Sequence, residues 1–406
     1  MKKVILIGFG PDPTSSDSRS AFSLRTKMFE IGLKQNGFEV EFIYLFDGKH
    51  EGCLNINSKK DRKIIQQKIN KSQSEFVIAS GFSICELVSS LKIKNKYLIY
   101  DLNGWTLAEM QAKAFSMSDD ILIPKKIKTE KQILKSGDFF TTVSQAQKFA
   151  TYGELALINK LSSRNFGKTV VTSIANKGIE FKKKNIQKDK TKFKIIWLGG
   201  FNNWADEKTL FEGIQKAMQK FSFIELVVTG GAIFGVNDSK YEWFKQKVSK
   251  SEFSDRFKLL NWADAKDVPE IIMSSDLGVN CDLECLETST GARNRINELV
   301  ANGVPVISSR GSEVATQIES QKLGVSFESG NPDDLAEKIE LAVLNQQKIW
   351  AVHCQTHSAD YSDFNELVCF LQNPFKSVSV KPSKIRLLKY YIQNKGIKDI
   401  LRKLGR

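Results

Sequence analysis

Arg293 and Arg295 lie at the start of a segment that the sequence predicts to be a helix ending near Gly303. The three hydroxyl residues 288–290 precede this helix and are good capping side chains. Cations near a helix start are unfavourable to the helix alone, so two arginines there indicate that they bind an anion. A phosphate at this position would also meet free backbone N–H groups. The segment therefore predicts a phosphate-binding site, with Glu298 deeper in the same helix.

Two glycines, Gly8 and Gly10, follow the first predicted strand and form a second candidate ligand loop. Glycine lets the backbone approach a ligand closely. The third glycine of a dinucleotide-binding fingerprint is absent, because residues 11–13 read Pro-Asp-Pro. Asp47 is also too distant to be the acidic residue of that fingerprint. The loop is compatible with a ligand, but the sequence argues against a nicotinamide dinucleotide.

The six cysteines are scattered and are expected to be reduced thiols packed as small hydrophobic side chains. Two groups invite a metal interpretation, namely Cys281 with Cys285, and His353 and Cys354 with His357. Neither group supplies four ligands at a zinc-site spacing. We therefore expect no metal site and no cofactor.

The net charge of +14 is concentrated at the C-terminus. Residues 381–406 hold nine Lys or Arg against Asp399, so a net charge of +8 lies there and +6 is spread over the other 380 residues. A chain that binds nucleic acid is expected to carry basic stripes on its folded body. The charge distribution therefore predicts no nucleic-acid partner.

Within this basic tail, Ile397, Ile400, Leu401 and Leu404 recur at helical spacing, with basic residues off that stripe. Such a helix lies in an anionic membrane interface more readily than it packs in a core. The alternative is a terminal helix that docks on the protein or frays. No apolar run is long enough to span a bilayer, and the first run ends at Phe9. We expect a cytoplasmic protein associated peripherally with the inner face of the cell membrane.

Short apolar runs alternate with helical patterns as far as residue 340. The runs are continuously apolar, as expected for strands covered on both faces. This order is typical of βαβ units and parallel doubly wound sheets. Strands are predicted at residues 4–8, 40–45, 76–80, 97–100, 139–143 and 169–174, and then at 194–198, 224–229, 257–260, 277–280 and 304–308. Helices are predicted between them, for example at 20–36, 206–221 and 293–301.

A polar, lysine-rich segment at residues 177–192 separates the two strand series and has the composition of a linker. The sequence therefore predicts an α/β fold of two Rossmann-like doubly wound domains facing a cleft. Residues 1–185 are assigned to the N-terminal domain and residues 192–345 to the C-terminal domain. Residues 346–380 should form a helical region that packs back on the body, and residues 381–406 the basic amphipathic tail. Ligands of such sheets bind at the carboxyl ends of the strands, which here line the cleft.

Several stretches resemble family-4 retaining glycosyltransferases with the GT-B fold. Glu298 opens the run ELVANGVPVI, which resembles E-A-x-A-x-G-x-P-V-I. Glu287-Thr288, Arg293 and Arg295 match a bacterial subset that has E-T-R-x-x-x-R-x-R. Three further stretches agree with that subset: GGFNNWAD at residues 199–206, GDFF at 137–140 with Ser144 and Gln147, and Asp101-Leu102 with Glu109. Together the matches span about residues 100–320.

The resemblance implies a role for each matching residue. Glu298 would accept hydrogen bonds from the ribose hydroxyls of a nucleotide-sugar donor. Arg293 and Arg295 would bind the diphosphate, for which bidentate donors are suited. Asp101 would face the transferred sugar or the acceptor from the first domain. The remaining donor-binding positions are Gly199, Gly200, Asn203, Thr290 and Gly291.

The sequence departs from the wider family at the carboxylate that contacts the sugar. That acidic residue normally stands eight positions before the equivalent of Glu298, and Thr290 occupies the position here. Glu287 is the nearest candidate to replace it, so Glu287, Asp101 and Arg293 are the expected catalytic residues. The Arg/Lys pair that usually follows the first strand of the donor domain is also absent, which leaves more of the diphosphate charge to the two arginines.

The resemblance implies a retaining transfer of a hexosyl or deoxyhexosyl group without a metal, from a nucleotide-diphosphate donor to a glycan or lipid-linked acceptor. Such a reaction would belong to bacterial cell-surface polysaccharide synthesis. Arginines and helix dipoles would stabilise the leaving diphosphate. Two alternatives stay open. A catalytically silent nucleotide- or sugar-binding protein is favoured by the missing carboxylate at Thr290, and a sugar-nucleotide epimerase is disfavoured by the scarcity of histidine.

Overall fold

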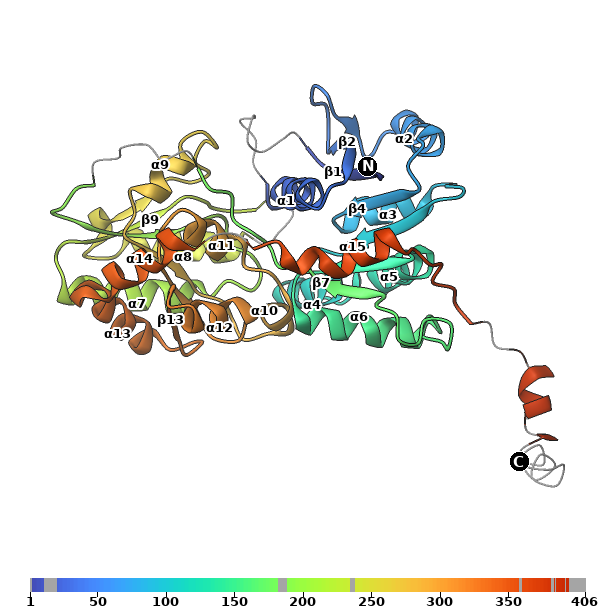
Figure 1. The fold of residues 1–406 in the computed structure, drawn as a ribbon. Helices are drawn as coiled ribbons and strands as arrows, with labels where there is room; N and C mark the ends of the chain where they lie inside the picture. The colour runs from blue at the N-terminus through green and yellow to red at the C-terminus, as the bar shows by residue number, and fades with distance from the viewer. Residues whose placement is uncertain are drawn as a thin grey trace.

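The computed structural model describes residues 2–10, 20–181, 188–233, 238–357, 360–380, 383, 385–390 and 392–393. Two parallel sheets form the cores of two Rossmann-like domains (Figure 1). The first sheet has the order β3 (Leu54–Asn55), β2 (Glu39–Phe46), β1 (Lys3–Phe9), β4 (Phe76–Ser80), β5 (Tyr97–Asp101), β6 (Phe139–Thr142) and β7 (Val171–Ser173). The second has the order β10 (Phe257–Leu259), β9 (Ile224–Val228), β8 (Phe193–Trp197), β11 (Leu277–Asn280), β12 (Val306–Ser309) and β13 (Gly324–Phe327). These sheets confirm the doubly wound α/β fold.

Helices connect the strands of each sheet. Those of the N-terminal domain are α1 (Ala21–Gln35), α2 (Lys59–Lys71), α3 (Phe82–Ser90), α4 (Thr106–Met117), α5 (Ile123–Ser136) and α6 (Gln145–Leu157). Those of the C-terminal domain are α7 (Glu207–Lys220), α8 (Ser239–Ser249), α9 (Val268–Met273), α10 (Leu286–Thr290), α11 (Asn294–Ala301), α12 (Glu313–Ser320) and α13 (Pro332–Leu341). Two more, α14 (Gln347–Thr356) and α15 (Asn365–Gln372), follow them.

Burial and capping explain why these segments form their elements. Every residue of β4 is buried, which accounts for its unbroken apolar sequence. Ser20 and Ser23 form a capping box at the start of α1. Asp206 caps α7 by accepting a hydrogen bond from the backbone N–H of Thr209 at 3.1 Å. These local signals fix the residues at which both helices begin.

The region after α13 packs on both domains. Trp350 and Cys354 of α14 join the core of the C-terminal domain. Leu367 and Phe370 of α15 join the core of the N-terminal domain, and Figure 1 shows α15 lying along that domain. Residues 346–380 therefore run from one domain to the other.

Three local features differ from the sequence-based expectations. The strands β3 and β13 were not predicted; β3 has only two residues and β13 has four. Residues 288–290 do not cap the arginine-bearing helix, since they lie inside α10 and α11 begins only at Asn294. Arg293 is the residue before α11 and makes no side-chain cap. The chain breaks between the two helices because Arg293 turns inward to buried carboxylates.

Parts of two expected segments lie outside the described residues. These are residues 182–187 of the linker and most of the tail, including the predicted stripe at Ile397, Ile400, Leu401 and Leu404. The tail residues 385–390 are helical and exposed. Within the described ranges, no helix is both long and apolar enough to cross a membrane.

Candidate functional site at the domain boundary

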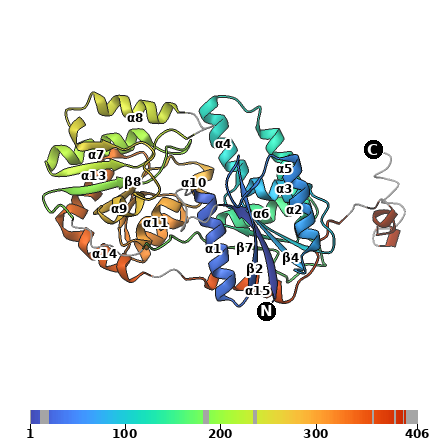
Figure 2. The same cartoon turned by 90° about the horizontal axis from the view of Figure 1, so that it is seen from above.

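The carboxyl ends of the two sheets meet at the boundary between the domains. Ser144, which caps α6, donates a hydrogen bond from Oγ to the carbonyl oxygen of Thr290 at 2.6 Å. Ser116 Oγ donates to Asn203 Oδ1 at 3.0 Å, and Glu313 accepts from the backbone N–H of Ala146 at 2.8 Å. The short helix α10 contacts both α4 and α6, and Figure 2 shows it at the boundary. The predicted ligand position, at the carboxyl ends of the strands, therefore lies here.

Arg293 forms the centre of a buried charge cluster on the C-terminal side of this boundary. Its Nε lies 2.5 Å from Asp282 Oδ2, and its Nη2 lies 2.9 Å from Glu287 Oε2. Burial by itself lowers the pKa of Arg293, but the two carboxylates raise it above its ordinary value. A Cβ on Gly291 would overlap Glu287 Oε1, so glycine is needed beside this pair. Two protein carboxylates thus pair with Arg293, and its expected role as a diphosphate ligand stays a prediction.

Glu287 is brought into the site by the same cluster. Its side chain is buried, and burial raises its pKa to about 7, against the opposing effect of Arg293. The carboxylate is oriented by two hydrogen bonds from Arg293, at 2.9 and 3.2 Å. Glu287 therefore changes its protonation state near neutral pH in a fixed position.

Arg295, two residues after Arg293 and the second residue of α11, has a different environment. Its guanidinium lies over the ring of Trp197 at 4.1 Å and donates from Nη2 to the carbonyl oxygen of Gly200 at 3.0 Å. Burial lowers its pKa to about 10, so it remains a cation at neutral pH. Its Nη1 is buried without a hydrogen-bond partner among the described residues. An unpaired buried donor is costly, and an anion bound here would satisfy it.

The glycine loop after β8 lies beside Arg295. Gly199 adopts a φ of +87°, which favours glycine. A Cβ on Gly200 would meet the side chain of Ile233 at 2.5 Å and that of Trp262 at 2.9 Å. The indole of Trp262 is 57% exposed, and its Nε1 donates to the carbonyl oxygen of Ala232 at 2.7 Å. The loop therefore brings an exposed aromatic face close to the unpaired cation. Trp262 was missed from the sequence, although its position just after β10 was a usable signal.

Two other expected donor residues have partners within the protein. Asn203 is buried and accepts the cross-domain hydrogen bond from Ser116. The hydroxyl of Thr290 donates to Leu286 within α10 at 2.8 Å, while its carbonyl accepts from Ser144. Both residues therefore help to join the domains at the site.

Glu298 contacts the segment that links the domains. Its Oε2 accepts a hydrogen bond from the backbone N–H of Ile179 at 3.0 Å, and its side chain is 6% exposed. Asn302, one turn later, donates to the carbonyl of Ile179 and accepts from the backbone N–H of Phe181. Helix α11 thus holds the linker through residues on one face. The role expected of Glu298 toward a ribose is still a prediction.

Asp101 is not accessible to a ligand in this structure. Its carboxylate is fully buried and pairs with Arg25, with Nη2 to Oδ1 at 2.8 Å and Nε to Oδ2 at 3.1 Å. Ser80 and Thr141 donate to the same two oxygens at 2.9 and 2.8 Å. The acceptor positions of Asp101 are thus used within the protein, and the expectation that it faces the transferred sugar stays a prediction.

Arg25 also connects this pair to the C-terminal domain. Its Nη1 donates to the carbonyl of Ile174 and to Asn176 Oδ1, both at 2.7 Å. Asn176 in turn donates to Asn294 Oδ1 at the start of α11, at 2.5 Å. No local sequence pattern marked Arg25, since it occupies an ordinary position in an amphipathic helix.

The N-terminal glycines are explained by packing. A Cβ on Gly8 would overlap the side chain of Thr26, and a Cβ on Gly10 would meet the ring of Tyr44 at 2.8 Å. Glycine at both positions lets α1 and β2 lie against the end of β1. The proposed ligand loop is therefore a close-packing site, and residues 11–19 after it lie outside the described range.

The helices α4, α5 and α6 each carry a carboxylate with a raised pKa. Burial raises the pKa of Glu109, whereas the positive charges of Lys126 and of Arg293 across the boundary lower it. Burial, followed by the charge of Glu154, raises the pKa of Glu130 to about 8. Trp105 donates from Nε1 to Glu154 at 3.0 Å. Among the described residues, no group of three or more His, Cys, Asp or Glu is arranged to hold a metal.

Comparisons with known proteins give a family match for part of the chain. Residues 178–352 match the family model described as glycosyl transferases group 1. Among curated proteins, none matches the sequence at a significant level.

Several solved structures share the fold over the whole chain. Sucrose-phosphate synthase from Thermosynechococcus elongatus has a TM-score of 0.58 at 14% identity, covering 97% of this chain and 99% of its own. HepE from Anabaena, in complex with UDP and glucose, has a TM-score of 0.59 at 15% identity, covering 92% and 100%. A putative UDP-N-acetylglucosamine 2-epimerase from Listeria monocytogenes has a TM-score of 0.51 at 14% identity, covering 94% and 99%. At these identities the similarity shows the GT-B fold.

The family match covers the segment that carries Arg293, Arg295, Glu298 and the glycine loop. These findings show the GT-B fold for the chain and a match of residues 178–352 to the glycosyl transferases group 1 family model.

Proposed function

We propose that this protein transfers a hexosyl or deoxyhexosyl group, with retention of configuration, from a nucleotide-diphosphate donor to a glycan or lipid-linked acceptor. The observation that carries the proposal is Arg295, a half-buried cation whose buried Nη1 has no partner among the described residues and which lies beside the Gly199–Gly200 loop. A diphosphate supplies the missing acceptors and the opposite charge. The site needs no metal for this step.

The neighbouring groups fit the rest of a nucleotide sugar. The exposed face of Trp262 offers a stacking surface for a nucleobase, and the loop leaves room for the backbone to approach the ribose and phosphates. Glu298 is the candidate to accept hydrogen bonds from the ribose hydroxyls. Glu287, held by Arg293, is the candidate for the sugar side.

In this reaction Arg295 would stabilise the charge that develops on the leaving diphosphate. Such preorganised electrostatic stabilisation is usually the largest catalytic contribution. Contacts across the boundary, such as Ser144 with Thr290, bring the acceptor-binding domain against the donor. Exclusion of water by this closed arrangement would suppress hydrolysis of the donor.

The proposed setting is bacterial cell-surface polysaccharide synthesis at the inner face of the cell membrane. Support comes from the basic tail at residues 381–406, with its net charge of +8. Anionic lipid attracts such polybasic segments. We propose that the tail presents the enzyme to a membrane-associated acceptor.

A catalytically silent nucleotide-binding protein is the second candidate. The observation that favours it is Asp101, which is fully buried and already paired with Arg25. A silent protein would keep the donor site and lack turnover. The two candidates therefore differ in turnover and agree in binding.

The test begins with a thermal-shift panel of UDP, GDP, TDP and CMP sugars, because a ligand that binds only the folded state raises its stability. We expect one class of nucleotide to raise the melting temperature. Arg295→Ala should weaken binding of that nucleotide roughly 30-fold, since a charged hydrogen-bonding group contributes about 2 kcal/mol. Arg164→Ala, an exposed arginine remote from the boundary, is the matched control and should bind like the wild type.

Turnover of the same nucleotide sugar then separates the two candidates. Release of the nucleoside diphosphate by the wild type, reduced in Arg295→Ala, supports the transferase. Binding without release of any nucleotide supports the silent protein. Absence of binding to every nucleotide sugar in the panel contradicts both.

A further inference from the structure

Exposed apolar side chains gather where the tail leaves the N-terminal domain. Leu157 ends α6 and is 85% exposed, and Phe166 in the loop that follows is 90% exposed. Leu161, Val378 and Val380 are also exposed. We call these five residues the exit surface. Isolated exposed apolar residues are ordinary, whereas a group of them marks an interaction site.

Hydrogen bonds and an ion pair fix the exit surface to the folded body. The backbone N–H of Val380 donates to the carbonyl oxygen of Asn159 at 2.8 Å. Lys376 Nζ lies 2.9 Å from Asp138 Oδ2, and Lys168 Nζ lies over the ring of Phe375 at 4.7 Å. The segment before the tail is therefore held against the loop that carries Phe166. The segment just before the tail, which carries Val378 and Val380, and the end of α6 form one continuous surface.

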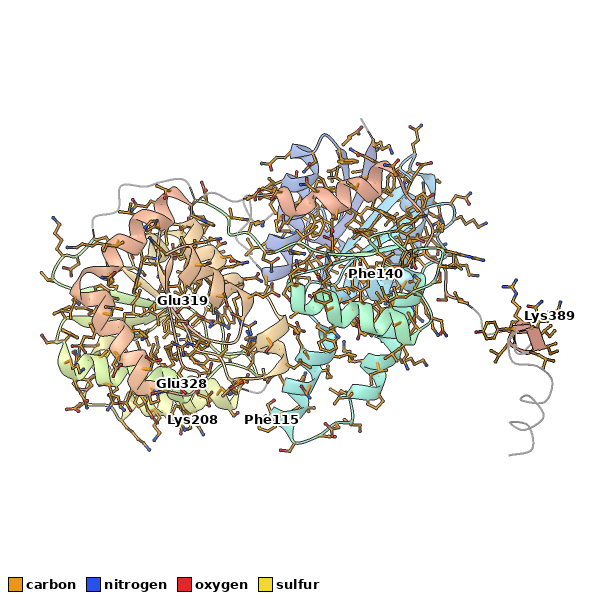
Figure 3. The ribbon with its side chains drawn as sticks, turned by 60° about the horizontal axis from the view of Figure 1, so that its bottom comes forward. Phe115, Phe140, Lys208, Glu319, Glu328 and Lys389 are labelled. Carbon is orange, nitrogen blue, oxygen red and sulfur yellow. The ribbon has the colours of Figure 1, made fainter. Side chains whose placement is uncertain are left out.

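The exposed charges of the exit surface are basic. The described stretches that build it, residues 155–170 and 375–380, contain no Asp or Glu. They contain four Lys or Arg, of which Arg164, Lys168 and Lys376 are exposed, and the Asp138 that pairs with Lys376 is buried. Beyond Val380, the exposed helical residues 385–390 continue the same mixture of apolar and basic side chains. Figure 3 shows Lys389 of this helix apart from the body.

A second exposed apolar group lacks this property. Phe115 is 81% exposed and Ile121 is 72% exposed at the turn between α4 and α5, where Figure 3 labels Phe115. Asp119 and Asp120 lie within the same turn. Carboxylates there oppose an anionic surface, so the two apolar groups of the domain differ in the partner that their charges fit.

We infer that the exit surface is a membrane-docking surface of the folded body, which inserts its apolar side chains into an anionic lipid bilayer together with the tail. Apolar side chains surrounded by cations are the composition that partitions into an anionic interface. A protein partner of opposite charge is the alternative outcome, and it would not require lipid.

This docking has a geometric consequence. The exit surface lies at the end of α6 opposite Ser144, which contacts the C-terminal domain. Helix α6 has 13 residues, so about 20 Å separate its ends. If the proposed function holds, an acceptor anchored in the same bilayer must reach that far to the donor site, which favours an extended lipid-linked glycan over a lipid carrying one sugar.

Vesicle co-sedimentation of the full chain tests the docking. The vesicles contain phosphatidylcholine alone or phosphatidylcholine with phosphatidylglycerol. The body variant Leu157→Glu with Phe166→Glu leaves the tail intact and changes only exposed side chains. The matched control is Phe115→Glu with Ile121→Glu, equally exposed in the same domain.

We expect the wild type and the control to bind the anionic vesicles, and the body variant to bind at least about tenfold more weakly, because two apolar insertions become two charges. Binding should fall with added salt and be weak on phosphatidylcholine alone. The inference is overturned if the body variant binds like the wild type, if the control loses as much, or if the wild type binds no vesicle.

Nucleotide binding in solution, measured on the same variants, keeps this test separate from the proposed function. The thermal shift caused by the nucleotide should be unchanged in the body variant, which also shows that the variant is folded. A protein that binds vesicles and no nucleotide would contradict the proposed function alone. A protein that binds nucleotide and no vesicle would contradict the docking alone.

Discussion

Each sheet ends near an arginine, which is buried in the N-terminal domain and half-buried in the C-terminal domain, and the two arginines differ in how fully their hydrogen-bonding groups are used. Arg25 of the N-terminal domain donates from all three guanidinium nitrogens, and both oxygens of its partner Asp101 accept. Arg295 of the C-terminal domain has one buried nitrogen without a partner among the described residues. A satisfied buried cation holds the fold together, whereas an unsatisfied one is prepared for a ligand.

The comparison also explains why the two sides of the boundary have different tasks. The bonds of Arg25 continue through Asn176 to Asn294 and so tie the linker to α11. Arg295 lies on that helix and faces the glycine loop instead. The fully hydrogen-bonded cluster around Arg25 and Asp101 thus helps to position α11, which carries Arg295 with its unpaired nitrogen.

The largest effect on stability should follow from removing the Arg25 side chain from its pair with Asp101. Arg25→Met leaves Asp101 buried without its cation, which should lower the free energy of unfolding by about 3–5 kcal/mol in urea denaturation. Adding Asp101→Asn should recover part of this loss, because the uncompensated charge is removed. Arg164→Met, at an exposed arginine, is the control. A loss below about 1 kcal/mol for Arg25→Met would show that the pair is not structural.

The pH dependence of stability sharpens the comparison on the C-terminal side. Glu287 has a folded pKa of about 7 against an ordinary value of 4.5, so the folded state binds its proton more tightly. Its contribution to stability is present below pH 4.5 and is lost as the pH rises through 7. Between these limits the wild type should lose on the order of 3 kcal/mol relative to Glu287→Gln.

Urea denaturation of both proteins across this pH range is the measurement. The sign is the critical result, because a carboxylate stabilised mainly by Arg293 would instead make the wild type gain stability as the pH rises. Parallel pH profiles for the wild type and Glu287→Gln would show that burial does not control this group.

The smallest effect on nucleotide binding should come from Trp262, at the exposed edge of the proposed donor site. Trp262→Ala should weaken nucleotide binding about tenfold, since stacking of a base on an aromatic side chain contributes roughly 1–3 kcal/mol. Trp262→Phe should retain most of the affinity, and nucleotide should quench the tryptophan fluorescence less in both variants than in the wild type. Trp243→Phe, in the packed core of the same domain, is the control. Unchanged quenching in Trp262→Ala would exclude Trp262 as the stacking surface.

Much of the fold could be predicted from the sequence because its signals are local. The unbroken apolar run of β4 and the helix signal of α7 need only neighbouring residues to be recognised. The strand β3 has two residues and gives no such signal. The separation of α10 from α11 was missed because it depends on Arg293 reaching Asp282, which lies on another element.

The candidate site was predicted only in part. Gly199, Gly200 and Arg295 come together as the sequence pattern indicates. The pairing of Asp101 was not predicted, because its partner Arg25 lies 76 positions earlier in the chain. When a charged residue lies in a motif that resembles a known family, the sequence alone does not show whether another residue of the protein forms an ion pair with it.

The sequence by itself determined the two doubly wound domains, since hydrophobic periodicity and capping act over a few residues. It also singled out the segment around Arg293 and Arg295 as a candidate anion site, because cations near a helix start oppose the helix dipole. Only the tertiary structure decided which of these arginines is available. Asp282 and Glu287 neutralise Arg293, while Arg295 keeps an unpaired donor. The reason is that hydrogen-bond saturation depends on partners from distant segments, and these are brought into contact only when the domains fold and meet.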